Sequence, residues 1–284
     1  MSYRFQRRVL GKSFVLSILG KWSILQWMKG CFVTRRRHGL RRRPWLVLLF
    51  VLGCTSPETG LNGADIPFLD ASAHGLTYVE RLTGGANADE PLPLIVAIHG
   101  LGDRPARFSG VFEGWAYKAR VVLPAGHMQW GDGRAWMTVR SAEIDRVDEL
   151  ASQTRHSADR IAGLIRDVTA TRPTLGQPIV TGFSQGGMLS YAIAVHHGDT
   201  VRAAVPVSGF LPTPLYPEEG KAIAPVFGLH GATDPVLSLD LAKDTKRALE
   251  NAGGTVTLRV YPNVPHRVTT TMRRDWLQFL EAKP

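Results

Sequence analysis

Three residue types that together support acyl transfer occur in one order along the chain. Ser184 lies between two glycines in Gly182-Phe183-Ser184-Gln185-Gly186, and Asp234 and His266 follow it. A serine hydroxyl is a poor nucleophile at neutral pH. It needs an imidazole to accept its proton, and the imidazole needs a carboxylate to hold its tautomer. This set predicts Ser184 as a nucleophile, His266 as its base and Asp234 as the group that orients the base.

The serine is placed by a predicted strand, a tight turn and a predicted helix. Residues 178–181 form a short apolar run rich in β-branched side chains, which is typical of a buried parallel strand, and residues 188–195 predict a helix. Such a turn holds its middle residue in a strained conformation above the sheet, and its glycines let the two backbones approach closely. A plain glycine-rich turn is the alternative, but this context favours a nucleophile.

The elements that position these residues alternate between strand and helix. Strands are predicted over residues 74–82 (at an edge), 92–98, 120–123, 178–181, 201–208, 225–230 and 255–261, and helices over 144–171, 188–195, 239–252 and 270–281. This alternation predicts the α/β class, with a doubly wound, mostly parallel sheet in a single domain. Ser184, Asp234, His266 and His99 each follow a predicted strand, so we expect them to meet at the carboxyl edge of the sheet.

Other histidines compete for the role of base. His196 and His197 lie further along the predicted helix that follows Ser184. Because a helix rises 1.5 Å per residue, they are expected to lie about 18 Å from the serine. His230 is closer, because it ends the strand before Asp234, and we interpret it as a buried histidine bonded to backbone. The order serine, aspartate, histidine is that of the α/β-hydrolase fold, which favours His266.

Acyl transfer also needs N–H donors for the oxyanion and a pocket for the substrate. The backbone N–H of Gln185 is one expected donor, and that of Leu101, in the loop of residues 99–103, is the other. His99 is interpreted as a support for this loop. The candidate pocket residues are large and apolar, although core packing explains them equally well: Phe108, Trp130, Trp136 and Met137.

Several motifs together resemble the phospholipase/carboxylesterase family, which includes acyl-protein thioesterases. They are His99-Gly100-Leu101-Gly102-Asp103, Gly182-Phe183-Ser184-Gln185-Gly186-Gly187, Asp234-Pro235-Val236 and Pro265-His266. Residues 133–136 also resemble a Gly-Arg-x-Trp segment of bacterial members. The resemblance spans about residues 90–280. It implies an α/β-hydrolase fold and a serine hydrolase of carboxylic esters or thioesters that uses no metal ion and no cofactor. Residues 138–157 depart from the family pattern.

The charge and the cysteines exclude other classes of function. Residues 1–53 contribute +12 to the formal net charge of +10, so residues 54–284 carry a net charge of −2. A nucleic-acid partner is not predicted, because no basic run with interleaved aromatic residues occurs there. Cys31 and Cys54 are the two cysteines, which excludes disulfides, cysteine metal sites and a cysteine nucleophile from residues 71–284.

The N-terminal segment predicts a location outside the cytoplasm. Arginines at residues 35–37 and 41–43 precede an apolar run at residues 45–52, which is typical of a signal peptide and too short to span a bilayer. Residues 51–54 resemble a bacterial lipobox, which implies a lipid anchor on Cys54 and a periplasmic or surface lipoprotein. We expect residues 1–53 to be a leader, with translation from Met28, residues 54–70 a flexible tether and residues 71–284 the hydrolase domain.

Three alternatives remain open at the level of the sequence. A small peptidase related to prolyl oligopeptidases shares the fold and the residue order, although this length leaves no room for a propeller domain. An acetyl or feruloyl esterase acting on polysaccharides is a second. The third is a surface lipoprotein that uses a hydrolase fold only to bind a ligand.

Overall fold

The computed structural model describes residues 69–139 and 144–281. The predicted leader, Cys54 and almost all of the predicted tether lie outside the described residues. No helix in the described part of the chain is both long and apolar enough to cross a membrane.

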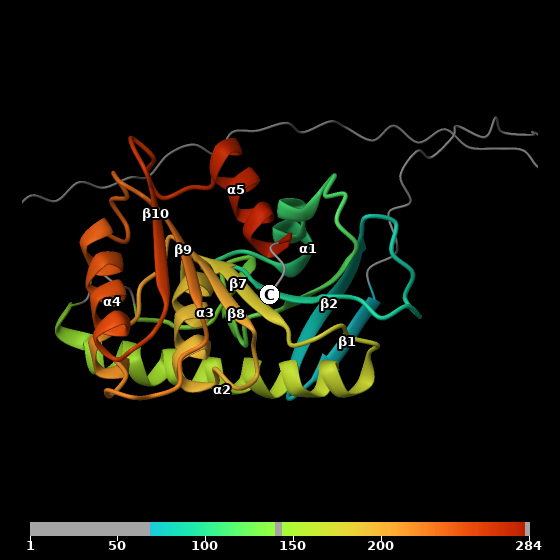
Figure 1. Ribbon diagram of the computed structural model, residues 1–284, viewed down its shortest axis with the longest axis horizontal. Coiled ribbons are helices and arrows are strands. Elements are labelled where there is room, and N and C mark those ends of the chain that lie inside the picture. Colours follow the sequence, from blue (N-terminus) through green and yellow to red (C-terminus); the bar gives the residue numbers. More distant parts are fainter. Residues whose placement is uncertain (1–68, 140–143, 282–284) are drawn as a thin grey trace, which may run out of the picture. The chain divides into compact units, whose positions relative to one another are not determined.

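The described residues are built on an eight-stranded sheet with the order β1-β2-β4-β3-β7-β8-β9-β10 (Figure 1). Its strands are β1 (Leu69–Ala73), β2 (Leu76–Thr83), β3 (Leu94–Ile98), β4 (Ala119–Pro124), β7 (Ile179–Phe183), β8 (Ala203–Val207), β9 (Val226–Gly231) and β10 (Val256–Tyr261). The strands from β4 to β10 pair in parallel, and β1 and β2 pair antiparallel. The predicted α/β fold with a mostly parallel sheet is therefore confirmed.

Helices cover both faces of this sheet, as Figure 1 shows. One face carries α2 (Val147–Thr171), α3 (Gln185–His196) and α4 (Leu239–Asn251), and the other carries α1 (Pro105–Phe108) and α5 (Thr270–Glu281). Because the connections between parallel strands are right-handed, the direction in which the chain moves along the sheet decides the face that each helix covers.

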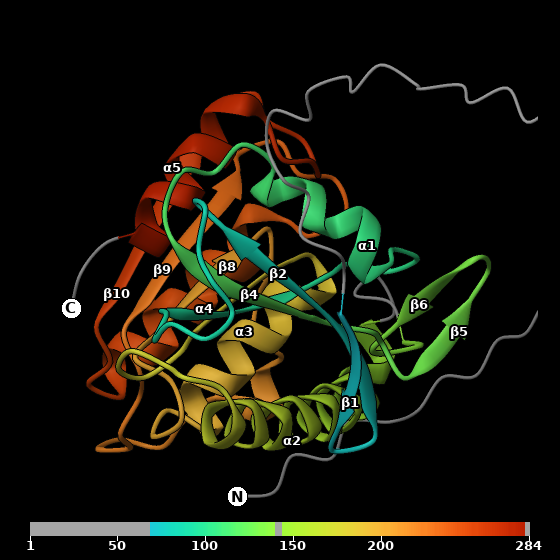
Figure 2. The same ribbon diagram turned by 90° about the vertical axis from the view of Figure 1, so that its right-hand side faces the viewer.

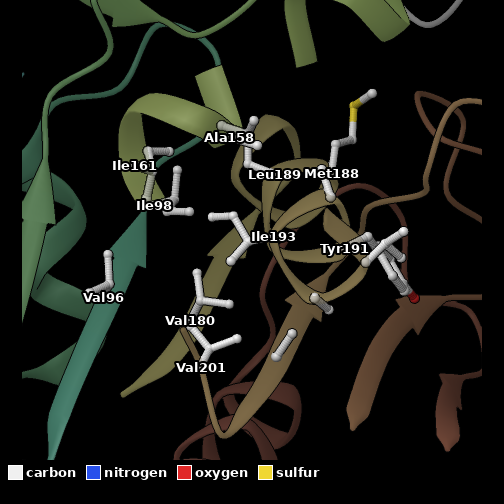
Figure 3. Packing of buried hydrophobic residues seen from close by; sticks show 14 of the residues in the cluster. Val96, Ile98, Ala158, Ile161, Val180, Met188, Leu189, Tyr191, Ile193 and Val201 are labelled. Atoms are coloured by element: carbon white, nitrogen blue, oxygen red, sulfur yellow. The ribbon is translucent and has the colours of Figure 1, made fainter. Parts of the chain in front are cut away.

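The strand sequences explain why both faces can be covered. Along β3, Val96 and Ile98 pack with the α2 and α3 side chains, whereas Ile95 and Ala97 pack with those of α1 and α5. Successive strand residues point to opposite faces, so a strand buried on both faces is a continuous apolar run. Figure 3 shows the α2 and α3 side of this core, with Ile193 above Val180 and Val201.

Two details differ from the sequence prediction. Residues 74–82 were expected to form an edge strand, but β1 pairs outside β2 and becomes the edge. No strand was predicted between residues 124 and 177, but residues 128–135 contain a hairpin of β5 (Met128–Trp130) and β6 (Gly133–Ala135), which stands apart from the main sheet (Figure 2). Strands of three and five residues are too short to give a clear period-2 signal.

Candidate active site

The turn between β7 and α3 gives Ser184 a backbone that few residues adopt. Its φ is 58°, in a region normally left to glycine. A Cβ on Gly182 would lie 2.5 Å from the carbonyl oxygen of Ile98, and one on Gly186 would lie 2.0 Å from the same atom. The two glycines are therefore required for α3 to pass close to β3, and this close passage presents the serine above the sheet.

Ser184, His266 and Asp234 form one hydrogen-bonded chain at the carboxyl edge of the sheet. The Nε2 atom of His266 lies 2.9 Å from Ser184 Oγ, and its Nδ1 atom lies 2.7 Å from Asp234 Oδ2. The carboxylate can only accept, so Nδ1 carries the proton and Nε2 is free to accept the serine hydroxyl. The ring of His266 also packs on Phe183, with ring centroids 4.8 Å apart.

Asp234 is held by its own loop after β9. Its Oδ1 atom accepts hydrogen bonds from the backbone N–H groups of Val236 and Leu237, both at 2.9 Å, which leaves Oδ2 for His266. His230 lies 3.8 Å from the same carboxylate and donates through Nε2 to the carbonyl oxygen of Leu237 at 2.8 Å. Burial lowers the pKa of His230, so it stays neutral and braces the loop.

The loop after β3 lies against the nucleophile. A Cβ built on Gly100 would be 3.3 Å from Ser184 Cβ, and Leu101 faces the same cavity as the serine. His99 is fully buried; Nδ1 lies 2.7 Å from the carbonyl oxygen of Gly100, and Nε2 accepts from the N–H of Gly126 at 3.0 Å. Burial lowers its pKa. His99 therefore acts as a support for the loop.

Gln185 begins α3 directly after the nucleophile. The N–H of a first helical residue has no acceptor within its own helix. The dipole of a helix also favours negative charge near its N-terminus. Gln185 directly follows Ser184 in the chain, and Leu101 lines the same cavity as these two residues.

A cavity of about 410 Å³ opens beside Ser184. Its lining is mostly aliphatic: Leu101, Met137, Val139, Leu150, Ser184, Gln185, Met188, Pro235, Val236 and Leu237. Leu101 and Val236 are unusually exposed for large apolar residues. The Met188 side chain points away from Val180 and Val201 in the core (Figure 3). A hydrocarbon chain is the kind of group that such a lining binds.

The four predicted pocket residues are placed in different surroundings. Met137 lines the cavity. Phe108 lies on the other face of the sheet, 6.2 Å from the ring of Trp276. Trp136 is fully buried and donates from its indole N–H to the carbonyl oxygen of His99. Trp130 lies in the β5–β6 hairpin beside Gly102. Val139, Leu150 and Met188 were not predicted, because nothing distinguishes them in the sequence from ordinary core residues.

The competing histidines lie away from the serine. His196 and His197 are at the far end of α3, where His197 Nε2 lies 2.7 Å from Asp159 Oδ1. Among residues 69–139 and 144–281, no group of three or more histidine, cysteine, aspartate and glutamate side chains is arranged to hold a metal ion.

Proteins of known family resemble this chain over most of its length. A model of the phospholipase/carboxylesterase family matches residues 85–283. The chain belongs to the phospholipase/carboxylesterase family. The match begins near β3 and covers every element that supplies Ser184, Asp234 and His266.

Relatives in this family are esterases and thioesterases. Acyl-protein thioesterase 1 of Mycosarcoma maydis is 26% identical over 223 residues, which cover 68% of this chain and 91% of that protein. Esterase YpfH of Escherichia coli is 25% identical over 187 residues, covering 62% and 76%. This chain is likewise a serine hydrolase of esters or thioesters.

The solved structures agree on the fold. The crystal structure of esterase PE8 matches with a TM-score of 0.60 at 21% identity, over 70% of this chain and 97% of that one. A phospholipase/carboxylesterase from Dyadobacter fermentans matches with a TM-score of 0.58 at 16% identity, over 75% and 99%. The α/β-hydrolase fold is confirmed.

The comparisons contradict the predicted location. The relatives include acyl-protein thioesterases from Mycosarcoma maydis and Neurospora crassa and lysophospholipase-like protein 1 from mouse, and they give no support to a signal peptide or lipid anchor. The prediction of an extracytoplasmic lipoprotein anchored through Cys54 is therefore wrong. It depended on a short pattern of arginines, eight apolar residues and one cysteine, which composition alone can produce.

Proposed function

We propose that Ser184 is the nucleophile of a carboxylic ester or thioester hydrolase. Its Oγ attacks the carbonyl carbon while its proton passes to His266 Nε2. Asp234 holds His266 in the tautomer that can accept this proton and stabilises the imidazolium that results. The observation that carries the proposal is the chain from Ser184 Oγ to His266 to Asp234, at 2.9 and 2.7 Å, at the wall of an apolar cavity.

The tetrahedral intermediate places a negative charge on the former carbonyl oxygen. In our proposal, the backbone N–H groups of Leu101 and Gln185 donate to it. His266 then returns the proton to the leaving alcohol or thiol, which departs and leaves an acyl group on Ser184. Water, deprotonated by His266, attacks this acyl-enzyme and releases the carboxylic acid. Donors of this kind each lower the barrier by about 3 kcal/mol.

The acyl side of the substrate is inferred to be aliphatic. Met137, Val139, Leu150 and Met188 present alkyl and thioether groups to the cavity, and no aromatic side chain lines it among the described residues. This lining suits a linear acyl chain better than a feruloyl ring. The similarity to acyl-protein thioesterase 1, whose name specifies an acyl group, supports the same substrate class.

Covalent labelling tests the proposed nucleophile. A fluorophosphonate probe reacts with an activated serine and forms a stable adduct. We expect mass spectrometry of the digested protein to find the adduct on Ser184, and we expect His266→Ala to abolish labelling although the serine is still present. Labelling of another serine, or labelling that His266→Ala leaves unchanged, would contradict the proposal.

A further inference from the structure

The segment Trp136–Val139 connects the β5–β6 hairpin to the active-site cavity without being part of a helix or strand. Its backbone is instead bonded by side chains. The Oε1 atom of Gln185 accepts from the N–H groups of Trp136 and Met137 at 3.0 and 3.4 Å. The Nε2 atom of Gln185 donates to the carbonyl oxygen of Met137 at 2.8 Å. One buried carboxamide therefore makes three bonds to this segment.

A second glutamine continues the same arrangement from α2. The Oε1 atom of Gln153 accepts from the N–H groups of Thr138 and Val139 at 2.8 and 3.4 Å. One turn further along α2, the hydroxyl of Ser157 donates to the carbonyl oxygen of Trp136 at 2.8 Å. The four consecutive N–H groups of the segment thus bind two glutamine side chains from two different helices.

This segment is also a wall of the cavity. Met137 and Val139 both line it, and both are almost fully buried. A loop without secondary structure would yield to a chain that presses on these side chains. Here a shift of the loop would break bonds to both glutamines. The N–H groups of Trp136 and Met137 are buried, and leaving them without acceptors is unfavourable. The wall is therefore held rigidly against α2 and α3.

We propose that the carboxamides of Gln185 and Gln153 are positioning residues that fix this wall and thereby set the length of acyl chain that the cavity accepts. The inference rests on the proposed function, since it assumes that the cavity receives the acyl group. Gln185 connects the wall to the reaction directly, because its backbone N–H is the proposed oxyanion donor and its side chain holds Met137.

Substitution by methionine separates the proposed role of the Gln185 backbone N–H, which is to bind the oxyanion, from that of the glutamine carboxamides, which is to hold the wall. Gln185→Met keeps the length of the side chain and the backbone N–H, but removes all three bonds to the wall. Gln153→Met does the same from α2, at a residue that does not adjoin the nucleophile. Gln177→Met is the matched control, because Gln177 also donates to a backbone carbonyl, that of Asp199 at 3.0 Å, but does so before β7, outside the cavity lining.

The readout is the ratio of kcat/KM for p-nitrophenyl decanoate to that for p-nitrophenyl butyrate, measured with the full chain. We expect both wall variants to raise this ratio by about fivefold or more, mainly through KM, because a yielding wall admits the longer chain. Hydrogen exchange of the peptide containing residues 136–139 should accelerate in both variants. Gln177→Met should change neither the ratio nor the exchange.

Several results would overturn the inference. A ratio within twofold of the unmodified chain, despite faster exchange, would show that the wall does not select chain length. An equal fall for both esters would mean that the glutamines serve stability alone. Unchanged exchange would show that they do not hold the segment. Absence of turnover in the unmodified chain is a separate result, which would overturn the proposed function and this inference with it.

Discussion

At the scale of single residues, the site depends on how Asp234 divides its hydrogen bonds. One carboxylate oxygen accepts from two backbone N–H groups and the other accepts from His266. The first set fixes the position of the carboxylate, so that the second can fix the tautomer of the imidazole. A side chain of the same shape at position 234 that can also donate a hydrogen bond would still occupy the position of the carboxylate. It would no longer hold His266 in the tautomer with the proton on Nδ1.

Asp234→Asn makes this change. The amide can donate from its NH₂ group to His266 Nδ1, which favours the tautomer with the proton on Nε2, where it cannot accept the proton of Ser184. We expect kcat to fall by about 10⁴-fold with little effect on folding. Steady-state kinetics with a short-chain ester measures the loss. Asp240→Asn, an exposed residue of α4 that pairs with Lys243, is the control, and a comparable fall in that variant would refute the assignment.

The sequence predicts these three residues better than it predicts the pocket. Ser184, Asp234 and His266 each follow a strand, and the parallel sheet brings such positions together. Pocket residues carry no comparable signal. Phe108 and Trp136 were candidates because they are large and apolar, but the core needs the same residue types, and both are buried in it. Leu150 and Met188 belong to apolar helix faces, and only the packing of those helices shows that they border a cavity.

At the scale of elements, the contact between α3 and β3 is set by a glycine. A methyl group on Gly186 would meet the carbonyl oxygen of Ile98 at 2.0 Å, and β3 is fully buried and has no room to move. We expect Gly186→Ala to lower the free energy of unfolding by about 3 kcal/mol or more. Urea denaturation of both proteins measures the difference.

Gly110→Ala is the matched control for that substitution. A Cβ on Gly110 would have no atom within 4 Å, and its φ is not positive. We expect a change within about 0.5 kcal/mol. Equal losses in the two variants would mean that the close approach of α3 to β3 is not what requires the glycine.

The helices and strands agree with the sequence prediction where the hydrophobic periodicity extends over many residues. The predicted helix over residues 144–171 and the helix over residues 270–281 are present as α2, with a short 3-10 turn before it, and α5. The β5–β6 hairpin was missed, although residues 131–132 are a Gly-Asp pair and Gly131 has a positive φ, which suits a two-residue turn. Strands of three residues are too short for their alternation to be recognised.

At the scale of the whole molecule, partial or complete burial lowers the pKa values of several histidines. Burial lowers the pKa of His196 to about 4 and also lowers the pKa values of His99 and His230. The ordinary value is about 6.5. Below that pH the unfolded chain binds more protons than the folded chain, so stability is fully present above about pH 6.5. It is lost progressively as the pH falls toward 4.

His196→Gln should reduce this dependence. His196 is only half-buried, so solvent screens part of this effect, and between pH 7.5 and pH 5 we expect the free energy of unfolding of the unmodified chain to fall by about 1 kcal/mol more than that of the variant. Urea denaturation at both pH values gives the difference. A variant at residue 196 that loses as much stability as the unmodified chain would show that burial of this imidazole does not control the effect.

The proposed role of Ser184 is tested most directly by the hydrolysis of p-nitrophenyl esters from acetate to palmitate by the full chain. Ser184→Ala is measured alongside it, and Ser152→Ala, at an exposed serine of α2, is the control. We expect turnover with a preferred chain length, a fall in kcat of about 10⁴-fold or more in Ser184→Ala and no change in Ser152→Ala. Turnover that persists in Ser184→Ala, or a folded protein that hydrolyses none of the esters, would contradict this role.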